Sequence, residues 1–285
     1  MKHYLFEMGF LFMSVQKKRV LAVISASIIM SAIRTVIVSF FMEKNVSGIN
    51  AYYLPENLAV LGFAALAALF LAVFVISAVK LGRKKRLVLE NGSASISVGS
   101  LIFAFTLIGE AIIYIYSIVI GESEIRSLGV VIFALTVICA VSFLFNVQSS
   151  CLKKRSETVL GLLALLPILL SAFRLLGDFI RTNAMPLASS GAYHLVGLVA
   201  VLLYFLCEGK AQISRGSAAV YYFFGFASVF FLLIYAVPNI ALFCFGNFDF
   251  NYYSSFSIVD LAIGVYICCR MCNTRIVEKD AALEA

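Results

Sequence analysis

Long apolar stretches alternate with short polar segments along the whole chain of 285 residues. A helix needs about 20 mostly apolar residues to cross the ~30 Å hydrocarbon core of a bilayer. Eight stretches meet this requirement, at residues 20–42, 57–79, 96–120, 128–147, 158–180, 193–206, 218–245 and 256–272. No stretch has the alternating pattern of a strand, and helices satisfy their own backbone hydrogen bonds in lipid. The pattern therefore predicts an all-α fold, a polytopic integral membrane helical bundle with eight transmembrane helices.

The composition supports a membrane location. The chain is 62% hydrophobic and 13% charged, whereas soluble domains are about half apolar and about a quarter charged. The formal net charge of +7 would suit a nucleic-acid partner, but the cations are confined to short patches between apolar runs. We therefore expect the lipid bilayer as the partner and no nucleic acid.

The distribution of cations predicts the orientation of the chain. Lys44, Arg126 and Arg181 fall on one side of the predicted membrane, and Arg34 and Arg174 fall inside spans. The rest of the 22 Lys and Arg residues fall on the side of the N-terminus. Because cytoplasmic loops carry an excess of cations, we expect both termini in the cytoplasm and a multi-pass protein of the cell (inner) membrane.

The loops are short, so we expect a single transmembrane domain over 1–285. Residues 1–16 contain a short apolar run that suits an amphipathic segment lying on the membrane surface; a frayed N-terminus is an equally good interpretation. Residues 276–285 are expected to form a flexible cytoplasmic tail.

Two halves of the chain resemble each other. Three cations at 17–19 precede Ser-Ala-Ile-Arg at 31–34, and three at 153–155 precede Ser-Ala-Phe-Arg at 171–174. Short matches recur in the same order later in each half, as in a four-plus-four parallel repeat of residues 17–150 and 151–275. Chance similarity between apolar segments is the alternative.

Five ionisable residues lie inside the predicted spans: Arg34, Glu110, Arg174, Asp178 and Asp260. With a rise of about 1.5 Å per residue, all five fall in the outer half of the membrane. An unpaired charge costs about 2.5–3.5 kcal/mol near the bilayer centre, so these side chains must pair, snorkel or face water. Arg34 and Glu110 are at matching depth, and Arg174 is one helical turn from Asp178.

Polar residues at helical spacing extend this layer. The predicted pocket for a solute or ion consists of Arg34, Glu110, Tyr114, Arg174, Asp178 and Asp260, with Ser31, Thr106, Ser171, Tyr235 and Asn239 as secondary residues. The competing interpretation is that the ion pairs only fix helix packing and that the hydroxyl groups bond their own helices.

The leading hypothesis is an outward-facing intramembrane pocket that binds or transports a small solute or ion. The alternative is a non-transporting accessory or sensor subunit with a protein partner and purely structural charges. An enzyme is a weaker hypothesis, because His194 is expected near the outer interface with no second imidazole nearby and no catalytic motif is present. Cys269 and Cys272 lack further ligands, so no metal and no cofactor are expected.

Overall fold

The computed structural model describes residues 15–44, 51–53, 58–82, 85–89, 93–120, 127–151, 157–183, 189–213, 216–244 and 252–278. The predicted surface segment at 1–16 lies outside these residues except for its last two positions, which begin the first helix.

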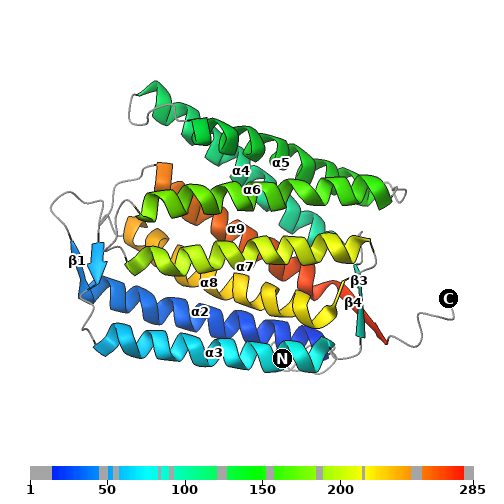
Figure 1. The fold of residues 1–285 in the computed structure, drawn as a ribbon, viewed down its shortest axis with the longest axis horizontal. Coiled ribbons are helices and arrows are strands. Elements are labelled where there is room, and N and C mark those ends of the chain that lie inside the picture. The colour runs from blue at the N-terminus through cyan, green and yellow to red at the C-terminus, as the bar shows by residue number, and fades with distance from the viewer. Residues whose placement is uncertain are drawn as a thin grey trace, which may run out of the picture.

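Eight long helices make up most of the described chain and run side by side along its longest axis (Figure 1). They are α2 (Val15–Phe41), α3 (Leu58–Gly82), α4 (Ala94–Val119), α5 (Ser127–Cys151), α6 (Glu157–Asn183), α7 (Ser189–Gln212), α8 (Ala218–Cys244) and α9 (Tyr252–Cys272). The helical bundle predicted from the apolar pattern is confirmed.

Seven of the described helices, α2 to α8, are long and apolar enough to cross a membrane. Large apolar side chains such as Leu69 and Val119 are exposed on the outside of the bundle, which is the arrangement that lipid as a solvent favours. The chain is therefore a multi-span helical membrane protein. The count of eight spans, with α9 as the eighth, stays a prediction.

The observed helix ends correct one predicted span. The apolar stretch at 193–206 lies within α7, which begins at Ser189 and continues to Gln212. The prediction ended this span too early because Glu208 and Lys210 interrupt the apolar pattern. The helix can continue past these two charges because Glu208 is buried inside the bundle and Lys210 is exposed.

Two short antiparallel strand pairs, which the sequence pattern did not predict, flank the helices. β1 (Met42–Lys44) pairs with β2 (Ala51–Tyr53) at one end of the bundle, and β3 (Lys85–Leu89) pairs with β4 (Thr274–Glu278) at the other (Figure 1). These are called the β1 end and the β3 end below. β4 takes in residues 276–278, which the sequence assigned to the tail.

Helix α8 lies in the middle of the bundle and packs against α2, α3, α7 and α9. Its packing is close at two glycines. A Cβ on Gly225 would come within 2.4 Å of the Met271 sulfur on α9, and a Cβ on Gly82, where α3 ends, would lie 2.0 Å from the Ala219 backbone nitrogen. A side chain at Gly82 would require a shift of the α8 backbone, and one at Gly225 would require the Met271 side chain to move.

The predicted repeat would make α4 the counterpart of α8. In the described chain α4 packs mainly against α5 and α9, so the two helices do not have matching sets of neighbours. The duplication stays a prediction.

Candidate functional site

A layer of buried charged side chains lies toward the β1 end of the bundle. Arg34, Glu110, Arg174, Asp178 and Asp260 are all buried. Each lies five to nine residues from the end of its helix nearest β1, which places it about 8–14 Å from that end.

A histidine stands at the centre of this layer and bridges two acidic residues. The His194 ring is 2% exposed and lies near the start of α7. Its Nδ1 is 2.9 Å from Oδ2 of Asp178 on α6, and its Nε2 is 2.8 Å from Oδ2 of Asp260 on α9. Both ring nitrogens can donate at the same time only in the imidazolium form, whereas a neutral ring would present one nitrogen to a carboxylate oxygen as an acceptor.

Asp260 also links the histidine to an arginine. Its side chain is fully buried, and its Oδ1 lies 3.3 Å from Nη2 of Arg174 on α6. The Arg174 guanidinium lies over the Phe256 ring, 5.0 Å from its centroid. An ion pair and a cation–π contact of this kind are strengthened where water is excluded. The sequence suggested Asp178 as the partner of Arg174, and the recorded pair reaches across to another helix.

Aromatic rings connect Arg34 to the same layer. The Tyr235 ring stacks on His194 with centroids 4.0 Å apart and planes 15° apart. Arg34 donates from Nη1 to the Ile234 carbonyl oxygen at 2.7 Å, and its Cζ lies 4.6 Å from the Tyr193 ring centroid. Arg34 therefore contacts the residues that directly precede Tyr235 and His194 in the chain, which places it next to the site. These contacts of Arg34 do not include Glu110.

Glu110 on α4 completes the layer. It is 2% exposed, and neither of its carboxylate oxygens has a hydrogen-bond partner among the described residues. It lies within electrostatic range of Arg174 and Asp260. A buried acceptor left without a donor costs about 1–3 kcal/mol, so this carboxylate has unused capacity for a proton or a cation.

Most of the secondary residues do not join this network. The hydroxyl groups of Ser31, Thr106 and Ser171 donate to carbonyl oxygens of their own helices at 2.7–2.8 Å, as the competing interpretation of the sequence expected. Asn239 donates to the Ser257 hydroxyl at 3.3 Å, bridging α8 and α9. Tyr114 is buried and stacks on Phe133.

Sequence reasoning missed the role of His194, because it was assigned to the membrane interface. The predicted span began at residue 193, which left His194 one residue from its outer end. The helix begins four residues earlier, at Ser189, so His194 lies five residues into α7, and Asp178 lies five residues from the end of α6. The earlier start of α7 brings the histidine into the same layer, and the apolar pattern gave no sign of it.

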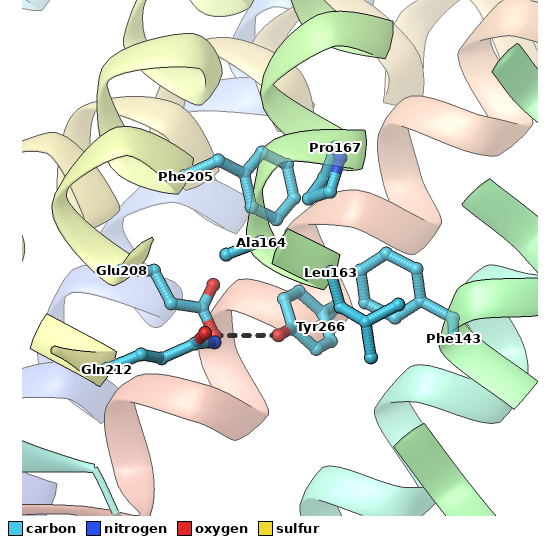
Figure 2. A pocket seen from close by; sticks show the side chains of 8 residues that line it. All are labelled: Phe143, Leu163, Ala164, Pro167, Phe205, Glu208, Gln212 and Tyr266. Carbon is cyan, nitrogen blue, oxygen red and sulfur yellow. Dashed lines mark hydrogen bonds between the residues drawn. The ribbon is translucent and has the colours of Figure 1, made fainter. Parts of the chain in front are cut away.

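A second buried polar cluster lies at the β3 end, and the sequence analysis overlooked it. It consists of Glu208 on α7 with Arg270 and Tyr266 on α9. Figure 2 shows the contact between Glu208 and Tyr266. Arg270 was assigned to the inner surface, but it is buried against Glu208 at 2.7 Å. The sequence analysis missed this pair because Glu208 and Arg270 lie near the predicted ends of their spans, where charged residues are expected at the membrane surface.

Comparisons of the chain with protein-family models, with curated proteins and with solved structures find no match.

Proposed function

We propose that this membrane protein binds and moves a small solute or ion through the layer of charges at the β1 end, with a proton as the ion that the geometry favours. The observation that carries the proposal is the buried Asp178–His194–Asp260 trio beside Glu110. Intramembrane ionisable residues are rare and are functional candidates by default.

The trio suits proton transfer because it contains three titratable groups in hydrogen-bond contact. Loss of one proton removes a donor from one of the two contacts of His194, which changes how α7 is held to α6 or α9. Glu110 supplies an additional carboxylate that can accept the proton or a cation. The Arg174 guanidinium offsets the negative charge of Asp260.

The direction of the site is part of the same proposal. The cation distribution places the β3 end in the cytoplasm and the β1 end on the outer face. The charged layer would then open outward from a multi-pass protein of the cell membrane with both termini inside.

The test is proton flux into proteoliposomes that contain a pH-sensitive dye, with a potassium diffusion potential as the driving force. The wild-type protein is expected to acidify the lumen faster than empty vesicles do. Glu110→Gln is expected to lose this flux because an amide cannot take up the proton. The matched control is Gly109→Ala, since a Cβ there meets no atom within 4 Å. Equal flux from wild-type and Glu110→Gln vesicles would reject the proposal.

The second candidate is an accessory or sensor subunit whose charges are structural. The observation that favours it is the degree of internal pairing, since Arg34 and Arg174 already have partners within the bundle. On this alternative Glu110→Gln changes no flux, and substitutions of Arg174 lower only the amount of folded protein. Measuring flux and folded yield on the same preparations separates the two.

A further inference from the structure

Glu208 forms a buried polar centre about 20 Å along α7 from His194. It is 3% exposed. Its Oε1 accepts hydrogen bonds from the Arg270 Nε at 2.7 Å and from the Tyr266 hydroxyl at 2.8 Å. Its Oε2 is buried and has no hydrogen-bond partner among the described residues. Oε1 of this carboxylate therefore has two hydrogen-bond donors, and Oε2 is available to accept a hydrogen bond from a ligand.

The unused oxygen lies at a pocket. The pocket is formed where α5, α6, α7 and α9 meet, and its walls include Glu208, Gln212, Phe143, Phe205 and Tyr266 (Figure 2). The pocket is partly open to the outside, and its enclosed part has room for little more than one water-sized molecule. The space suits a ligand of one or two heavy atoms.

A second acceptor shares this pocket. Gln212 follows Glu208 by one helical turn, and Figure 2 shows the two side chains next to each other. The Oε1 of Gln212 is also buried with no hydrogen-bond partner in the described part of the chain. Two buried acceptors without donors cost about 1–3 kcal/mol each, and a ligand that donates to both would remove that cost.

The walls of the pocket are aromatic. The Phe143 and Tyr266 rings meet edge to face with centroids 5.1 Å apart, and Phe205 stacks on Tyr266 at 6.1 Å. Aromatic faces attract cations more strongly when water is excluded. The described residues contain no group of three side chains able to hold a metal ion.

We propose that this pocket is a binding site for a small ammonium group, either the ammonium ion or a short primary amine. Its N–H groups donate to Oε2 of Glu208 and to Oε1 of Gln212, and its charge faces the aromatic rings. The site is separate from the charged layer at the β1 end, so it goes beyond the proposed function.

The first experiment measures ligand binding to the purified full-length protein in detergent by isothermal titration calorimetry at constant ionic strength. The probe is methylammonium chloride. Acetamide, which has N–H donors and no charge, and tetramethylammonium, which has charge and no N–H donor, are the comparison ligands. Methylammonium is expected to bind at least about tenfold more tightly than either. Absence of saturable methylammonium binding, or equal affinity for acetamide, would overturn the proposal.

The second experiment uses variants that keep the Glu208–Arg270 pair, because loss of that pair would leave a buried charge and endanger folding. Gln212→Met keeps the side-chain length, removes the acceptor, and is expected to weaken methylammonium binding about tenfold. Ala164→Leu fills the pocket from α6 and is expected to abolish binding. Lys210→Met, an exposed position on α7, is the matched control with unchanged binding.

Circular dichroism and the melting temperature of each variant establish that it is folded. Unchanged binding by both folded pocket variants would reject the site. Proton flux in proteoliposomes is measured in parallel, because loss of amine binding with normal flux, or the reverse, identifies which of the two sites has failed.

Discussion

Asp260→Asn is the substitution that most directly perturbs the charged layer. Asp260 is fully buried and contacts both the Arg174 guanidinium and the His194 ring. The amide keeps the size of the side chain and removes its negative charge. The Arg174 guanidinium then loses the contact with its carboxylate on α9, and His194 keeps its contact with Asp178.

The expected loss of stability follows from these contacts. Two unit charges 3.3 Å apart attract by about 5 kcal/mol at an effective dielectric constant of 20. Breaking a buried pair by removing one partner typically costs about 3–5 kcal/mol. With an unfolding entropy of about 2.1 cal/mol/K per residue over 285 residues, this corresponds to a fall in melting temperature of about 5–8 °C.

The assay is loss of helical circular dichroism on heating the purified protein in detergent at a fixed scan rate. Circular dichroism is chosen because the chain has no tryptophan to serve as a fluorescent reporter. The control is the double variant Arg174→Met/Asp260→Leu, which removes the pair together. Replacing both partners of a buried pair by apolar residues is often neutral, so the double variant is expected to melt above Asp260→Asn.

Two results would refute this reasoning. A melting temperature of Asp260→Asn within about 1 °C of wild type would mean that the contacts of Asp260 contribute no net stability. A double variant that melts lower than the single variant would mean that the loss comes from altered packing rather than from the uncompensated charges.

Three further predictions follow from the packing. Gly82→Ala is expected to destabilise the fold by about 1–3 kcal/mol, because its Cβ would collide with the α8 backbone; Gly62→Ala on the same helix, where the Cβ meets nothing within 4 Å, is expected to melt like wild type. Ser31→Ala and Ser171→Ala are expected to change stability by less than about 0.5 kcal/mol and proton flux not at all, since both hydroxyls bond only their own helices; a large loss of flux would contradict this. Tyr235→Phe is expected to retain the ring stack on His194 and to melt within about 2 °C of wild type. Tyr235→Leu is expected to lose the stacking contribution of about 0.5–1.5 kcal/mol to the free energy of unfolding and therefore to melt at a lower temperature.

The apolar pattern was sufficient for the helices and for the depth of the charges, because both depend on position along the chain. Helix α8, Ala218–Cys244, differs from its predicted span by one residue at its C-terminal end. Arg174 and Asp260 were expected at similar height along the bundle, and their side chains are in contact. The rise per residue converts sequence number into height in the membrane, and this conversion needs no knowledge of tertiary structure.

The partners could not be predicted in the same way, because they depend on how each helix is rotated about its axis and which helices are neighbours. For Arg174 the sequence suggested Asp178 on its own helix, and it gave no indication of the ion pair with Asp260 on α9. Arg34 was matched with Glu110 by depth and is found against a backbone carbonyl of α8. Glu208 was missed because its burial depends on Arg270, which lies 62 residues later.

Each polar cluster contains a carboxylate with acceptors that have no hydrogen-bond donor among the described residues. At the β1 end this holds for both oxygens of Glu110, and at the β3 end it holds for Oε2 of Glu208. A carboxylate that served only packing would be expected to have all its acceptors satisfied, as Oε1 of Glu208 is, because each unmet bond lowers the stability of the bundle. Helices α7 and α9 contribute to both clusters, and Phe205 and Tyr266, which line the Glu208 pocket, lie between the two clusters along these helices. An apolar residue at position 110 would avoid the cost of burying a carboxylate without donors, so the presence of Glu110 there is the physical argument for a site that handles a ligand.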